Sequence, residues 1–159
     1  MSTVLTLNAS TAKELYPSAS KEFKVLLTET FGKDFFQGKI TDRIKTVEDA
    51  CKVLSITTTN VYDETIDTPH DAAYKQLQVV IRALNEGWKP DWKNASQPKY
   101  YPWFYMDETP NNSQGFLLSD VRGYCALSSV GSRLCFRSRE LAEYAATQFK
   151  DLYQTYLTA

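Results

Sequence analysis

Apolar residues recur with a period of about 3.6 through much of the first ninety positions, which predicts a series of amphipathic helices. The clearest is capped by Thr68, with Pro69 at its first helical position and Asp71 placed to bond back to the cap. Gly87 is expected to end this helix. Its buried stripe is predicted to consist of Ala73, Leu77, Val80, Ile81 and Leu84.

Three further helices are predicted before this one, each from a polar cap followed by apolar residues at helical spacing. The third of them covers the pattern that begins at Thr41, and a polar loop with an acidic cluster follows it. The caps and stops expected in chain order are Ser10 or Thr11 with Pro17, Ser20 with Gly32, and Thr46 with Asp49 as a capping box.

The second half of the chain changes to a strand pattern. In the aromatic run YYPWFYM, alternation places Tyr101, Trp103 and Tyr105 on one side, and Pro102 favours an edge strand because it cannot donate to a ladder. A short strand is expected near 116–118. Segments 122–128 and 132–136 are expected to form a hairpin around Val130 and Gly131.

A final amphipathic helix is predicted from Ser138, with Leu141, Ala145, Phe149, Leu152 and Tyr156 on its inner stripe. The expected fold class is therefore α+β: a helical N-terminal half, a small antiparallel β-meander of about three strands, and a closing helix packed on the sheet. We expect one domain over residues 1–159, with its helical part at about 10–87 and the sheet plus final helix at about 99–157.

Composition and charge narrow the class of protein. The formal net charge of −1 disfavours binding of nucleic acid through bulk charge. No apolar run approaches the length of a membrane span, and the N-terminus lacks the pattern of a secretory signal. Three cysteines, Cys51, Cys125 and Cys135, suggest reduced thiols. We therefore expect a cytoplasmic protein.

Four blocks of sequence carry a resemblance to a known family. ITDRIKTVEDACKVL, ALNEGWKPDW, KYYPWF and GSRLCFRSRELAEYAATQFKDLY are similar to small uncharacterised proteins carried by phages, prophages and related mobile elements of Bacteroidetes. The resemblance covers roughly residues 39–157, and DETPNNSQGFLLSDV occupies the place of a variable insert in that family. It implies a mobile-element setting, and hence the cytoplasm of a host cell, with association with a virion as the alternative. It implies no established activity, so no catalytic residue follows from it.

Catalytic signals are sparse. His70 is the single histidine, and a solvated position in the first helical turn is a better interpretation of it than a general base. No cysteine or histidine pair has metal-ligand spacing, and no glycine-rich phosphate loop is present in the sequence. We expect no cofactor, no metal and no enzymatic activity. An unrecognised enzyme is kept as the third hypothesis, after a protein-binding function and binding of single-stranded nucleic acid.

A nucleic-acid alternative rests on basic residues near the predicted hairpin. Arginines on a sheet face beside an exposed tyrosine can hold single-stranded nucleic acid by stacking and phosphate contact. The competing interpretation is an exposed sheet face or ion pairs with nearby acidic residues, and the tyrosines would then be core. The candidate residues are Arg122, Tyr124, Arg133, Arg137 and Arg139.

The aromatic residues of the second half favour a protein interface, because so many rings cannot all be fully buried in one small core. The leading hypothesis is a binding protein that acts through a protein partner or self-association, with an aromatic mini-core as the competing interpretation. The interface candidates are Trp88, Trp92, Tyr101, Trp103 and Tyr105.

Overall fold

The fold is that of a computed structural model, which describes residues 7–106, 115–124 and 133–159. It is α+β, as predicted, with a helical N-terminal half, a two-stranded antiparallel sheet within the described residues, and C-terminal helices that pack on the sheet and on helices. Contacts group the chain into two compact units, Met1–Arg43 and Ile44–Ala159. The expectation of a single domain stays a prediction.

The first unit is built from short helices around an aromatic cluster. Ser20 accepts a hydrogen bond from the Phe23 N–H at 3.2 Å and Gly32 ends the helix, as predicted. The first helix is instead capped by Asn8, because its Oδ1 accepts the Thr11 N–H at 2.9 Å. The elements are α1 (Ala9–Leu15), η1 (Tyr16–Ser18), α2 (Lys21–Phe31), α3 (Lys33–Gln37) and α4 (Ile40–Arg43).

The helix predicted from Thr41 is broken in two. The first unit ends with α4, and α5 (Val47–Leu54) begins the second unit after an extended Thr46. Thr46 and Asp49 form the predicted capping box, and a residue that caps a new helix has left the helical conformation. A 3₁₀ turn, η2 (Thr58–Asn60), follows in the polar loop.

The central helix, α6 (Pro69–Leu84), begins as predicted with Thr68 as its cap. All five residues of the predicted stripe are buried. The helix ends at Leu84, three residues before the expected Gly87, because Asn85 takes the C-cap and Glu86 adopts a left-handed φ of 48°.

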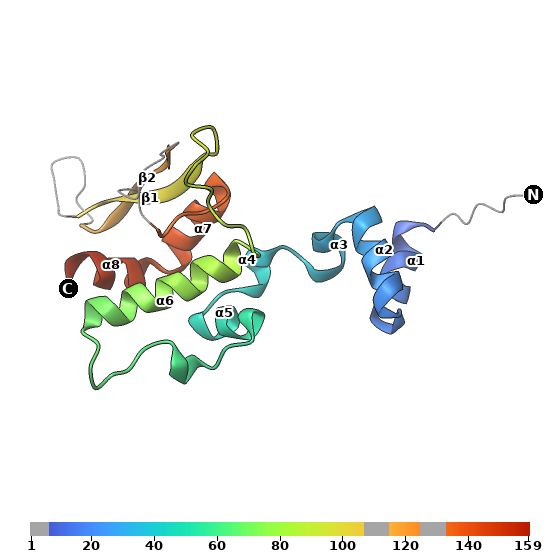
Figure 1. Cartoon of the computed structure of the whole chain (residues 1–159), viewed down its shortest axis with the longest axis horizontal. Helices are drawn as coiled ribbons and strands as arrows, with labels where there is room; N and C mark the ends of the chain where they lie inside the picture. The colour runs from blue at the N-terminus through green and yellow to red at the C-terminus, as the bar shows by residue number, and fades with distance from the viewer. Residues whose placement is uncertain (1–6, 107–114, 125–132) are drawn as a thin grey trace, which may run out of the picture. The chain divides into compact units, whose positions relative to one another are not determined.

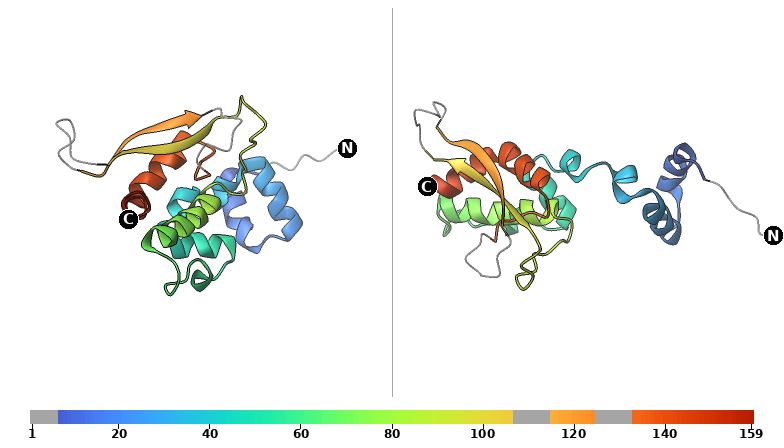
Figure 2. Two further views of the ribbon diagram at one scale, coloured as in Figure 1. Left: turned by 60° about the vertical axis from the view of Figure 1, so that its left-hand side comes forward. Right: turned by 90° about the horizontal axis from the view of Figure 1, so that it is seen from above.

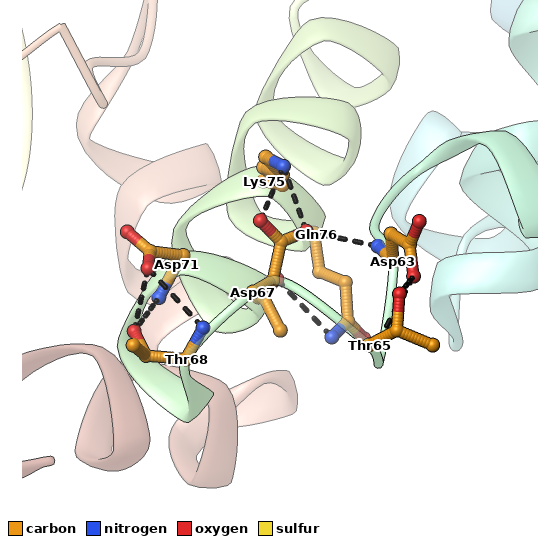
Figure 3. A network of polar contacts seen from close by, with 8 residues as sticks. Asp63, Thr65, Asp67, Thr68, Asp71, Lys75 and Gln76 are labelled. Carbon is orange, nitrogen blue, oxygen red and sulfur yellow. Dashed lines mark hydrogen bonds and ion pairs between the residues drawn. The ribbon is translucent and has the colours of Figure 1, made fainter.

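A polar network holds the loop before α6 (Figure 3). Asp71 accepts hydrogen bonds from the Thr68 N–H and hydroxyl, and Asp67 accepts from Lys75 Nζ at 2.7 Å through each carboxylate oxygen. The Asp67 carboxylate also accepts the Asp63 N–H at 2.8 Å. The hydrogen bond from Lys75 lowers the pKa of Asp67, and the hydrogen bonds from Thr68 lower the pKa of Asp71.

This network predicts loss of stability in acid. Because folding lowers the pKa of Asp67 and Asp71, their contribution is present above the unfolded Asp pKa of about 3.9 and is lost as the pH falls through their folded values. Urea midpoints measured between pH 7 and pH 3 should therefore decline. Asp67→Asn should flatten the decline, whereas Glu29→Gln on α2 should leave it unchanged; equal slopes in all three proteins would contradict the assignment.

The sheet consists of β1 (Lys99–Tyr105) and β2 (Leu117–Tyr124). The expected strand at 116–118 and the first strand of the expected hairpin, as far as Tyr124, belong to this one strand, with Tyr101 opposite Arg122. The second strand of the hairpin is absent from the described residues, where Phe136 alone forms a bridge to Tyr100. The expected turn at 130–131 and residues 125–128 lie outside the described residues.

The segment around Phe136 is held from both sides. Phe136 bonds to Tyr100 of β1. On the opposite side, the Asn85 side chain donates to the Cys135 carbonyl at 2.9 Å and accepts the Arg137 N–H at 3.0 Å. The end of α6 therefore satisfies the backbone groups that face away from β1.

The predicted final helix is two helices, α7 (Arg139–Gln148) and α8 (Lys150–Thr158). Ser138 caps α7 as predicted, and the chain leaves helical geometry at Phe149, where φ is −116° and ψ is 33°. The change of direction allows α7 to pack on both strands and α8 to pack on α6. Figures 1 and 2 show the resulting order in this unit: the sheet, then α7 and α8, then α6, with α5 on the far side of α6.

Candidate functional site

A groove with an apolar lining lies between the edge of β1 and α8. Its volume is about 340 Å³, and we name it the β1–α8 groove. It exists because α8 turns away from α7 at Phe149. Its lining includes Pro102, Trp103 and Met106 on one side and Tyr153, Tyr156 and Leu157 on the other.

The strand edge at this groove offers little backbone pairing. Tyr100 exchanges both backbone hydrogen bonds with Phe136, at 3.1 and 2.7 Å, so its polar groups point away from β2. Pro102, two residues on, points the same way because directions alternate along an antiparallel strand. Pro102 has no N–H, but the ladder with β2 does not need one at this position and stays intact. On the edge that faces away from β2, Pro102 therefore offers a carbonyl acceptor and no N–H donor.

Tyr153 contributes its ring to the lining of the groove. Its side chain is 3% exposed, and its hydroxyl is buried with no hydrogen-bond partner among the described residues. Burial raises the pKa of Tyr153 above its usual range, so the hydroxyl stays protonated. An unpaired buried hydroxyl costs about 1–3 kcal/mol of stability.

Large apolar side chains are exposed around the mouth of the groove. Trp103 is 48% exposed, and Tyr105, Met106 and Leu157 are exposed as well. The Arg122 guanidinium lies 5.0 Å from the centre of the Trp103 ring and forms no ion pair within the described part of the chain. A cation stacked on an exposed indole forms a surface with both apolar and positive character.

The other predicted interface residues have different roles. Trp88 and Tyr101 are half-buried, and Tyr101 also lines the groove. Trp92 is half-buried and contacts two cations, Lys99 Nζ and the Arg133 guanidinium, each 5.4 Å from its ring centre. The predicted interface residues therefore lie in more than one place: Tyr101 and Trp103 line the groove, whereas Trp92 lies beside Arg133.

The predicted arginine platform is dispersed. Arg137 pairs with Glu86 at 2.7 Å, and Arg139 pairs with Asp120 at 3.2 Å and with Glu143 at 3.6 Å. The hydrogen bond from Arg139 lowers the pKa of Asp120. The structure thus brings Arg122 to Trp103 and Arg133 to Trp92, with Tyr124 at the end of β2. Binding of single-stranded nucleic acid on the sheet face stays a prediction.

The single histidine lies at the start of α6. His70 Nδ1 is 2.7 Å from the Tyr156 carbonyl oxygen, so this nitrogen acts as a hydrogen-bond donor, and its ring centre is 5.0 Å from that of Tyr156. The ring is exposed, but it ties the start of α6 to the end of α8. No group of three or more acidic, histidine or cysteine side chains suited to a metal occurs among the described residues.

Sequence reasoning did not identify the groove as a site. Tyr156 was expected on the inner stripe of the final helix, and Tyr101 and Trp103 were interface candidates, but Tyr153, Leu157 and Met106 had no assigned role in a site. Their convergence depends on the turn at Phe149 and on the bulge between Trp103 and Phe104. Neither feature has a glycine or proline signal at that position in the sequence.

Comparisons with protein-family models, with curated proteins and with solved structures found no match. Among the described residues, no helix is both long and apolar enough to cross a membrane. The site is therefore interpreted from its own geometry.

Proposed function

We propose that this chain is a non-enzymatic binding protein of a phage or mobile element, and that its β1–α8 groove holds an amphipathic helix from a partner protein. The observation that carries the proposal is an apolar groove whose lining residues Trp103, Met106 and Leu157 are large and exposed. Exposed apolar surface beside such a groove is typical of protein-binding sites.

The edge chemistry favours a helix over an added strand. A strand added to β1 would face Pro102, which offers no N–H, and would lose a ladder hydrogen bond there. A helix satisfies its own backbone and needs only to insert apolar side chains.

The positive charge of Arg122 indicates a further property of the partner helix. Arg122 is exposed, stacks on Trp103 and forms no ion pair in the described ranges. A partner helix with an acidic residue beside its apolar stripe would meet this guanidinium at the rim of the groove. We therefore expect apolar residues at helical spacing with an acidic flank.

The test is selection of peptides from a displayed library against the full chain, followed by titration of the selected peptides. Enriched peptides should carry apolar residues spaced as on one helical face. Leu157→Asp should weaken their binding by about tenfold or more, because it places a charge in the groove. Ile66→Asp, an equal change at an exposed residue outside the groove lining, should leave binding unchanged. Equal affinity in both variants, or enriched peptides without helical spacing, would overturn the proposal.

Tyr153→Phe should raise stability and leave peptide binding unchanged. Removing a buried hydroxyl without a partner should increase the free energy of unfolding by about 1 kcal/mol. The same change should leave peptide affinity unchanged, because the hydroxyl is buried and the ring that lines the groove is kept. Urea denaturation and peptide titration measure the two effects.

Tyr144→Phe is the matched control for this change. The Tyr144 hydroxyl donates to the Ile44 carbonyl at 2.6 Å, so its removal should lower stability by about 1 kcal/mol and leave peptide affinity unchanged. A loss of stability in Tyr153→Phe, equal to that in the control, would show that the Tyr153 hydroxyl is satisfied in the free protein.

A further inference from the structure

A second cavity lies in the Ile44–Ala159 unit, on the other side of Leu134 from the groove. Its volume is about 810 Å³, and Leu134 lines both cavities. Three segments form it: the loop after α5, one face of α6, and the short segment that contains Arg133. We name it the Arg82–Arg133 pocket.

The lining of this pocket is positively charged. It contains Lys75, Arg82 and Arg133, and none of the described residues that line it is acidic. Asp67 neutralises Lys75 through contacts of 2.7 Å, as Figure 3 shows. Arg82 and Arg133 are exposed and form no ion pair within ranges 7–106, 115–124 and 133–159, so two guanidinium charges remain uncompensated.

One of these charges is held in place. Arg133 lies over the Trp92 ring, whose centre is also 5.4 Å from Lys99 Nζ. Lys99 is itself 2% exposed and donates to the carbonyls of Asn94 and Gln97 at 3.3 and 3.0 Å. This buried lysine fixes the loop that carries Trp92, so a ligand of Arg133 meets an ordered side chain.

The remaining lining is of two kinds. Thr57, Asn60 and Gln78 supply neutral hydrogen-bonding groups, whereas Val61 and Val79 supply an apolar surface. Guanidinium groups bind phosphate oxygens with paired hydrogen bonds, and two of them match a doubly charged phosphate better than a single carboxylate. A volume of about 810 Å³ falls in the range of pockets for small organic ligands.

We infer that the Arg82–Arg133 pocket binds an organic phosphate of nucleotide size, with the phosphate between the two guanidinium groups and the uncharged part against the apolar lining. The inference is independent of the β1–α8 groove and of any protein partner. The same chemistry is offered by a free nucleotide and by the phosphorylated end of a nucleic-acid strand.

The test is calorimetric titration of the full chain with four probes: inorganic phosphate, a mononucleotide, and one short single-stranded oligonucleotide with and without a 5′ phosphate. The mononucleotide should bind more tightly than inorganic phosphate, and its affinity should fall with salt. Tight binding of the mononucleotide would identify a free nucleotide as the ligand. Binding of the oligonucleotide only when it is phosphorylated identifies a strand end.

Matched variants separate the pocket from bulk charge. Arg82→Gln should reduce affinity about tenfold or more, because it removes one of the two uncompensated guanidinium groups. Lys89→Gln changes the net charge equally at an exposed residue that lines neither the pocket nor the β1–α8 groove, and should leave affinity unchanged. Equal losses in the two variants, or no saturable binding of any probe, would overturn the inference. Leu157→Asp should not affect these titrations, so this test fails or succeeds separately from that of the groove.

Discussion

Replacing Phe136 with alanine is expected to lower the free energy of unfolding by about 3–5 kcal/mol. The Phe136 side chain is 0% exposed and is among the largest of the fully buried side chains. Its backbone exchanges two hydrogen bonds with Tyr100, so the backbone is held at the edge of β1 and cannot shift to fill the cavity that the lost ring would leave. Since domains are stable by about 5–15 kcal/mol, this single change would remove a large part of the total.

The measurement is urea denaturation of the full chain, with Phe136→Leu as the control. Leucine keeps most of the buried apolar volume and should cost only about 1–1.5 kcal/mol. If the alanine and leucine variants lose the same small amount, the ring does not occupy a rigid part of the core.

Asn85→Ala is expected to cost about 2–4 kcal/mol, the second largest effect. Asn85 is 4% exposed, and its side chain bonds to the Cys135 carbonyl and to the Arg137 N–H at 2.9 and 3.0 Å. Alanine would leave both of these backbone groups without their partner. The penalty for each unmet group exceeds the net value of an ordinary hydrogen bond.

Asn94→Ala is the control for this change, again in urea denaturation. Asn94 is exposed, and its side chain accepts one hydrogen bond, from the Ser96 N–H at 2.8 Å. Its replacement should cost less than about 1 kcal/mol. Similar losses in the two variants would show that water replaces the contacts of Asn85.

Both changes affect the segment that separates the two proposed sites. Leu134 lines the groove and the Arg82–Arg133 pocket, and it lies between Arg133 and the residues that Asn85 and Phe136 hold in place. Loosening this segment should therefore weaken peptide binding and phosphate binding together. Leu157→Asp and Arg82→Gln, in contrast, should each affect one site.

Helix starts were predictable where one residue supplies the cap. Ser20, Thr46, Thr68 and Ser138 each accept the backbone hydrogen bond expected of an N-cap, because the cap and its partner are only three residues apart. The same locality explains why the buried stripe of α6 was correct. The predicted start of the first helix was at least two residues too late, because its cap is Asn8 and neither Ser10 nor Thr11.

The groove was not predictable, because its walls depend on distant contacts. The final helical pattern continues through Phe149 without a breaking residue, yet the chain turns there so that α7 can cover the sheet and α8 can cover α6. Within the described residues the expected third strand is a single bridge at Phe136, and Asn85, about fifty residues earlier, bonds the backbone on either side of it. Neither partner can be identified from local spacing.

The sequence alone determined the fold class, most of the helix starts and the aromatic first strand, because caps, periodicity and alternation act over a few residues. Only the tertiary structure decided which side chains converge. Arg133 lines the same pocket as Arg82, whereas Arg137 pairs with Glu86. Tyr153 lines the groove, and its buried hydroxyl has no partner among the described residues. The physical reason is that buried backbone groups must find partners, and these partners come from whichever element packs nearest.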